Sequence, residues 1–125
     1  MKNSNKKWIK RIYYHIFPFG LRVYYGITYK EIHKDLLKGL PKEAHKEIKE
    51  FKGIYDGRVH MFSTGQTVMV LNKKDSATIA HESFHATEFL LHRLHIEHCR
   101  ETSEVYVYMT GYIVGEITTK NPDIK

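Results

Sequence analysis

Residues 58–94 read RVHMFSTGQTVMVLNKKDSATIAHESFHATEFLLHRL, and the order of secondary structure is clearest in this part of the chain. The segments Arg58 to Phe62 and Thr67 to Leu71 are rich in β-branched and apolar residues, which predicts two strands. The four residues between them suit a turn, so the two strands are expected to form a β-hairpin. Asp75 or Ser76 can then cap a helix.

The predicted helix has apolar residues at helical spacing, which indicates one face buried against a core. Its core-facing positions are expected to be Ala77, Ala80, Phe84, Leu91 and Leu94. A hairpin followed by a helix that packs on it indicates an α+β domain.

The same helix carries the pentapeptide His81-Glu82-Ser83-Phe84-His85. Two histidines four residues apart lie on one helix face, separated by a rise of about 6 Å, so both imidazoles can reach one metal ion. The enclosed Glu82 is rotated by about 100° from His81, which sets its carboxylate where it can take a proton from a water on that ion. The pattern therefore predicts a zinc site for metal-assisted hydrolysis.

A catalytic zinc needs a third protein ligand. His92 stands about 16 Å along the helix axis from His81 and cannot share its ion. A histidine six residues after the motif is also excluded, because that position is Leu91 and the turning glycine that it would require is replaced by Glu88.

The segment after the motif offers two carboxylates, Glu101 and Glu104. Ser103 can cap a last helix, and an antiparallel helix would carry its first turn back past the motif. Glu104 is the favoured third ligand because it falls inside that helix, and Glu101 stays open as the alternative. The core face of this helix is expected to hold Val105, Met109, Tyr112, Ile113 and Ile117.

A further electrophile could assist the reaction, and Tyr108, Tyr112 and His60 are the available candidates. Core packing is the favoured explanation for both tyrosines, and a polar position on a strand face is the favoured one for His60, so none of the three is assigned a catalytic role.

Upstream of the hairpin, Leu21 to Ile27 reads as a strand. Thr28 and Glu31 have the spacing of a capping box for a helix over 29–39. Pro41 and Gly53 suit the two ends of a second helix. Trp8 to Phe19 fits either a short helix or a packed extended segment, and residues 1–10 are expected to form a basic, flexible tail.

The chain of 125 residues is 42% hydrophobic and 13% aromatic, which fits one folded domain over residues 1–125. Its single cysteine, Cys99, excludes an internal disulfide and favours a reducing compartment. No segment has the length and apolarity of a spanning helix or the pattern of a signal peptide, so a cytoplasmic protein without a membrane span is expected.

Positive charge is concentrated in the first half, where residues 1–53 hold 13 Lys or Arg against 5 Asp or Glu. A solvated helical surface explains this best. The alternative function that it allows is a non-enzymatic module, stabilised by zinc, whose basic half contacts nucleic acid or an acidic protein.

Two segments resemble a known family. They are residues 78–89 (TIAHESFHATEF) and residues 104–112 (EVYVYMTGY). They look like the small zincin-like metallopeptidases of bacteriophages and prophages, in which a histidine pair is followed by a glutamate about twenty residues on, a tyrosine four residues later and then Gly-Tyr.

The resemblance implies a minimal zincin-like fold, in which a small antiparallel or mixed sheet packs on the motif helix and on a C-terminal helix that carries the third ligand. It also implies that His81, His85 and Glu104 bind Zn²⁺ and that Glu82 is the general base. The implied activity is that of a zinc-dependent metalloendopeptidase acting on a protein or peptide.

Overall fold

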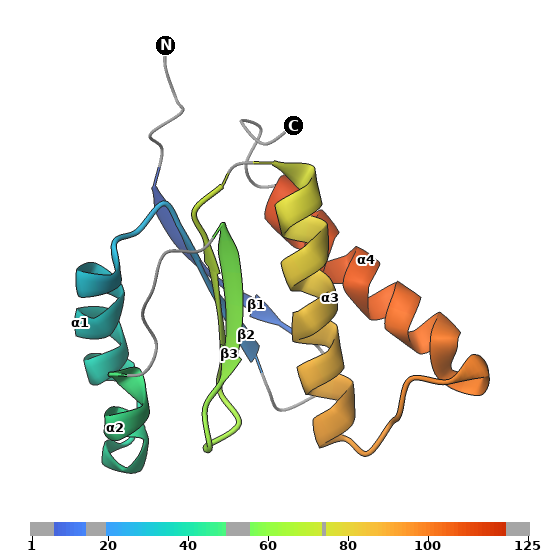
Figure 1. Cartoon of the computed structure of the whole chain (residues 1–125), viewed down its shortest axis with the longest axis horizontal. Coiled ribbons are helices and arrows are strands. Elements are labelled where there is room, and N and C mark those ends of the chain that lie inside the picture. Colours follow the sequence, from blue (N-terminus) through green and yellow to red (C-terminus); the bar gives the residue numbers. More distant parts are fainter. Residues whose placement is uncertain (1–6, 15–19, 50–55, 74, 120–125) are drawn as a thin grey trace.

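The computed structural model describes residues 7–14, 20–49, 56–73 and 75–119, which form a mixed four-stranded sheet with helices on both faces (Figure 1). The elements in chain order are β1 (Trp8–Tyr13), β2 (Gly20–Tyr25), α1 (Tyr29–Gly39), the 3₁₀ turn η2 (Lys42–Ala44), α2 (His45–Ile48), β3 (Gly57–Met61), β4 (Thr67–Leu71), α3 (Ser76–Arg93), the 3₁₀ turn η3 (Arg100–Thr102) and α4 (Ser103–Thr119).

The strand order is β1-β2-β4-β3. β2 and β4 run parallel, with Leu21 opposite Thr67 and Tyr25 opposite Leu71, whereas the β1-β2 and β3-β4 pairs are antiparallel. The chain passes from β2 through α1 and α2 to the hairpin, which is the crossover that a parallel pair requires. The α+β class and the predicted hairpin are therefore confirmed.

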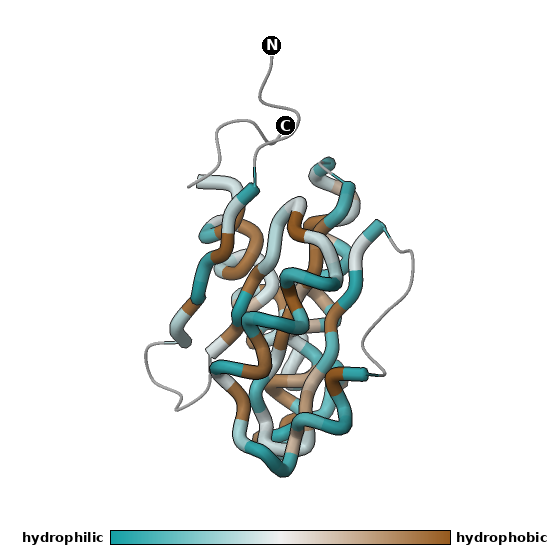
Figure 2. The backbone as a smooth tube through the Cα atoms, turned by 90° about the vertical axis from the view of Figure 1, so that its left-hand side faces the viewer, coloured by the Kyte–Doolittle hydropathy of each residue, from teal (hydrophilic) through white to brown (hydrophobic). Residues whose placement is uncertain are grey.

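Two hydrophobic clusters fill the space on either side of the sheet. Leu21, Val23 and Met69 pack with α3 and α4 on one face, and Tyr24 and Val68 pack with α1 and α2 on the other. Central strands buried on both faces carry nearly continuous apolar sequence, which β4 shows in Thr67–Leu71. In Figure 2 the hydrophobic segments lie mainly in the interior of the molecule.

The described part of the aromatic segment that begins at Trp8 forms the edge strand β1. Of the two predicted conformations, a short helix or an extended segment, it therefore adopts the extended one. Trp8 stacks on Tyr25 with 4.8 Å between ring centroids. Lys10 Nζ donates to the backbone oxygen of Glu116 at 3.0 Å, and so ties this edge to α4. The expectation of a basic tail over residues 1–10 is thus wrong for Trp8, Ile9 and Lys10, and residues 1–6 lie outside the described residues.

The N-terminal capping residues predicted for α1 and α3 are present in the structure. Thr28 Oγ1 accepts from the backbone N–H of Glu31 at 3.2 Å, and Asp75 Oδ1 accepts from that of Thr78 at 2.7 Å. The second helix is shorter than predicted, because α2 ends at Ile48, and Gly53 lies outside the described residues.

The cap of α3 provides a pH-dependent test. Hydrogen bonds from Thr78 and the charge of Lys73 lower the pKa of Asp75, so its contribution to stability is present above its ordinary pKa and is lost as pH falls through the lowered pKa. Asp75→Ala is expected to lower Tm by a few degrees at pH 7, and the difference should shrink below about pH 4. Thermal unfolding followed by circular dichroism at both pH values measures this. Asp75→Asn keeps a side-chain oxygen that can accept the hydrogen bond from Thr78, so its Tm should fall less than that of Asp75→Ala. Equal decreases in Tm for the two variants would contradict a capping role.

The buried face of α3 differs from the prediction. Ala77 and Ala80 are exposed, Leu91 is buried as expected, and Phe84 and Leu94 pack at the margin of the core. The residues that face the interior are Ile79, Glu82, Ser83, Ala86, Thr87, Leu90 and Leu91. The buried face of α3 is therefore rotated from the predicted one. Small polar side chains are buried where α4 packs closely, and the spacing of apolar residues alone does not predict them.

On α4, Met109, Ile113 and Ile117 are buried as expected, but Val105 is exposed. Ser103 does not cap this helix, because the 3₁₀ turn η3 precedes it and Cys99 occupies the N-cap position of that turn. Among the described residues, no helix is long and apolar enough to cross a membrane.

Candidate metal centre

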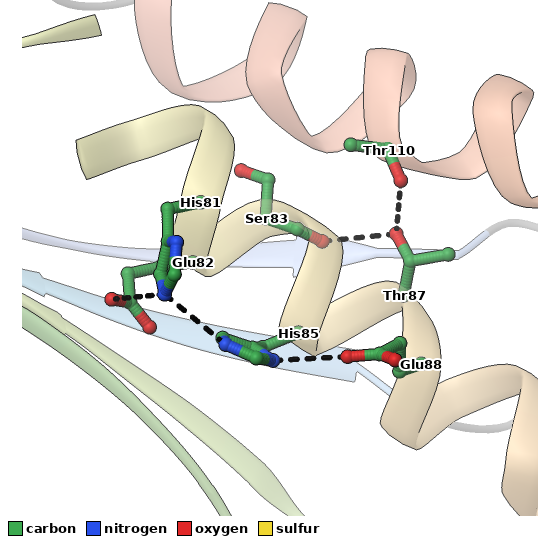
Figure 3. Close-up of polar contacts among 7 residues, drawn as sticks. All are labelled: His81, Glu82, Ser83, His85, Thr87, Glu88 and Thr110. Carbon is green, nitrogen blue, oxygen red and sulfur yellow. Dashed lines mark hydrogen bonds and ion pairs between the residues drawn. The ribbon is translucent and has the colours of Figure 1, made fainter. Parts of the chain in front are cut away.

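His81 and His85 lie one turn apart on α3, and their side chains meet (Figure 3). The two Nε2 atoms are 3.2 Å apart, and both side chains are accessible, at 68% and 46% exposure. Two imidazole nitrogens bound to one zinc at about 2.0–2.1 Å in tetrahedral geometry are about 3.3 Å apart. The pair therefore has the spacing of two ligands to one ion.

Glu88 contacts the far side of the second histidine. His85 Nδ1 and Glu88 Oε1 are 2.9 Å apart, a hydrogen bond across one turn of α3 (Figure 3). A carboxylate in this position favours the tautomer with the proton on Nδ1, which leaves the lone pair of Nε2 free for a metal. Glu88 also limits rotation of the His85 ring.

Glu82 lies beside the histidine pair and is buried, with 7% of the residue exposed. Its Oε2 is 4.0 Å from His81 Nε2. Burial raises the pKa of Glu82 above its ordinary value, and the nearby His81 and His85 partly counter this. A carboxylate with a raised pKa is a better proton acceptor than an ordinary one.

Gly57, the first residue of β3, allows Glu82 to lie against the sheet. A Cβ at this position would come within 2.7 Å of Glu82 Cγ and 2.9 Å of Thr78 Cγ2, closer than atoms can pack. Sequence reasoning missed this residue. A glycine at the start of a strand is the available signal, since such a residue often marks a close approach by another element.

The expected grouping of His81, His85 and Glu104 is not formed in the described part of the chain, where no cluster of three or more His, Cys, Asp or Glu residues could hold a metal. Glu104 is exposed, and it lies about 200° around α4 from Tyr106, whose ring contacts Phe84 of α3. Glu104 therefore lies on the side of α4 away from the contact between Tyr106 and Phe84. Glu101, in η3, is also exposed.

Helix α4 packs on a different side of α3 from the one that carries the histidines. Thr110 Oγ1 donates to Thr87 Oγ1 at 3.0 Å, and Thr87 donates in turn to the backbone oxygen of Ser83 at 2.9 Å. In Figure 3 this contact lies on the α4 side of the helix, whereas His81 and His85 lie on the side away from α4. This difference in direction separates the histidine pair from the glutamates of the following helix.

The three candidate electrophiles lie elsewhere. Tyr108 is 74% exposed, and Tyr112 donates its hydroxyl to the backbone oxygen of Tyr13 at 2.8 Å, at the β1 edge. His60 packs edge-on against Phe62, which belongs to the core cluster on the α1 face, opposite to α3.

Other histidines were not expected as ligands, and His98 contacts Tyr106 with 4.5 Å between ring centroids.

Comparisons of the chain with protein-family models, with curated proteins and with solved structures give no significant match.

Proposed function

We propose that this chain is a zinc-dependent metallopeptidase in which His81 and His85 bind the metal and Glu82 is the general base. The observation that carries the proposal is the 3.2 Å separation of the two Nε2 atoms, with a buried carboxylate 4.0 Å from one of them. Two histidines that hydrogen-bond to each other reach the same separation, so the feature that supports a catalytic role is the buried carboxylate beside the pair.

Two imidazoles supply two of the three protein ligands that a catalytic zinc needs, the Glu88 contact favours the Nδ1–H tautomer of His85, and the Glu82 carboxylate lies beside the pair. A bound zinc ion supplies Lewis acidity and makes water a stronger acid. Glu82 accepts the proton of the attacking water and passes it to the leaving amine. The absence of a side chain at Gly57 leaves the space in which Glu82 packs against β3.

Among the described residues, the sheet offers one backbone edge near this site. β4 is paired on both sides, with β2 and β3, so its backbone groups are already bonded. β3 ends the strand order and contacts α3, which carries the motif. An extended peptide substrate is therefore proposed to pair with Gly57–Met61 by adding a strand. Thr67–Leu71, the other strand of the hairpin, is internal.

The third protein ligand stays a prediction, with Glu104 favoured and Glu101 as the alternative. Ligation by either carboxylate requires the segment between α3 and α4, or the first turn of α4, to rearrange when metal binds, because neither carboxylate forms a group with the two histidines. Segments outside the main core rearrange at low cost in free energy, and the residues between α3 and α4 are largely exposed.

Zinc analysis of purified variants tests the ligand set. The wild-type chain is expected to hold about one zinc ion, and His81→Ala should lose it. Glu104→Ala should lose it as well, whereas Glu101→Ala should keep it if Glu104 is the third ligand. Full zinc in Glu104→Ala would remove Glu104 from the site.

Chelation separates a catalytic zinc from a structural one. Neither hydrophobic cluster includes His81 or His85, so removal of zinc is expected to abolish hydrolysis while the circular dichroism spectrum stays that of a folded protein. Global unfolding on chelation would instead support the alternative, a binding module that zinc holds together.

Glu88 provides a separate prediction about the support of His85. Glu88→Ala is expected to weaken zinc binding by about 10–100-fold, because the imidazole loses the partner that sets its tautomer and orientation. Competition with a fluorescent zinc chelator measures the change. Glu97→Ala, a charge-matched control in the exposed segment after α3, should bind zinc as the wild type does. Equal affinities in the two variants would mean that the 2.9 Å contact does not support the ligand.

A further inference from the structure

A pocket of about 470 Å³ lies on the face of the sheet opposite to the histidine pair. Its walls are the ends of β1 and β2, the C-terminal part of α1 and the turn between β3 and β4, which lies at the lower end of the sheet in Figure 1. Asp35 and Leu36 contribute from α1, and Thr64, Gly65 and Gln66 from the turn. The proposed metal site uses none of these residues.

Two arginines line this pocket from neighbouring strands. Arg11 of β1 and Arg22 of β2 are directly opposite each other in the antiparallel register. Side chains at such positions start about 5 Å apart on the same face, and like charges placed there repel each other. A pair of this kind costs stability unless negative charge compensates it.

Only one of the two arginines has its charge compensated within the described residues. Arg22 Nη1 donates to Asp35 Oδ2 at 2.8 Å, and the hydroxyl of Tyr24 donates to the same oxygen at 2.6 Å. Arg11 is exposed and makes no ion pair or side-chain hydrogen bond with any described residue. Two guanidinium groups against one carboxylate leave the pocket with an excess of positive charge.

The C-terminal end of α1 also borders the pocket, and its carbonyl groups could offset this charge. Two of them are already satisfied. Leu36 O accepts from the backbone N–H of Leu40, and Leu40 O is 2.9 Å from His45 Nε2. No described residue supplies Arg11 with a side-chain acceptor, and the same pocket is lined by Thr64 and Gln66, whose side chains hydrogen-bond to each other at 2.9 Å.

We propose that this pocket binds an oxyanion, the phosphate or carboxylate group of a small ligand, with the Arg11 guanidinium as its main contact. A planar guanidinium forms two parallel hydrogen bonds to either group. Arg22 adds favourable charge while Asp35 holds its side chain in place. The exposed ring of Tyr13, at the rim, offers an apolar surface to the body of the ligand.

Titration with inorganic phosphate, followed by ¹H–¹⁵N correlation spectra at constant ionic strength, tests the site. Saturable shifts are expected for the amides of Gly65, Gln66 and Gly20, and Arg11→Gln should weaken binding by about tenfold or more. Lys30→Gln is the control, since it removes the same charge from the first turn of α1, about 13 Å along the helix from Gly39. It should change affinity less than twofold.

A parallel titration with succinate identifies the chemical group, because the probe that saturates at the lower concentration names phosphate or carboxylate as the preferred one. Arg11→Gln should stay folded with an unchanged or higher Tm, since it relieves the repulsion with Arg22 and breaks no described contact. Shifts that rise linearly with both probes, or equal affinity in Arg11→Gln and the wild type, would overturn the proposal.

Discussion

Glu82→Gln is expected to lower the rate of peptide-bond hydrolysis by about 10²- to 10⁴-fold, which is the usual contribution of a general base. Glutamine has the shape of glutamate but cannot accept the proton of the attacking water. The zinc content should stay at the wild-type level, because the His81 and His85 side chains are untouched. A coupled measurement of zinc and of cleavage of an unstructured protein substrate records both effects on one sample.

Glu43→Gln is the matched control for this experiment. Glu43 is exposed in η2, which lies on the α1 side of the sheet. Its replacement should leave both the zinc content and the rate of hydrolysis unchanged. Hydrolysis by Glu82→Gln at the wild-type rate would refute the assigned base even if zinc is bound. Loss of zinc from Glu82→Gln would instead point to Glu82 as a ligand.

Gly57→Ala is expected to damage stability and activity together. The added Cβ would lie 2.7 Å from Glu82 Cγ, so either β3 or the Glu82 side chain has to move. Overpacking of this kind costs about 1–3 kcal/mol of folding free energy. Displacing a catalytic group by about 1 Å can reduce the rate by about 10²-fold. Urea unfolding and the cleavage assay measure the two consequences independently.

Gly111→Ala is the control for the same chemical change. Nothing lies within 4 Å of a Cβ built at Gly111, which is inside α4, so the variant should gain about 0.5–1 kcal/mol from reduced backbone entropy. Wild-type stability and activity in Gly57→Ala would show that close packing of β3 on Glu82 is not needed for either. A stability loss with full activity would separate the packing role from the proposed catalytic one.

Much of the local structure was predictable because the signals for it are local. The caps at Thr28 and Asp75 involve residues three positions apart, and the hairpin of β3 and β4 is marked by its turn. The spacing of His81 and His85 follows from the pitch of a helix in the same way. Ala77 and Ala80 were predicted to be buried but are exposed, because the elements that pack against a helix decide which of its faces is buried.

The sequence by itself determined that one helix presents two histidines and a glutamate at metal-binding spacing, because helix geometry depends on neighbouring residues alone. Only the tertiary structure decided that Glu82 is buried against Gly57, that β3 and not β4 lies at an edge of the sheet, and that Glu104 does not join the two histidines in one group. These features depend on strand order and on the direction in which α4 packs on α3. Contacts between residues far apart in the chain set both, and no local pattern records them.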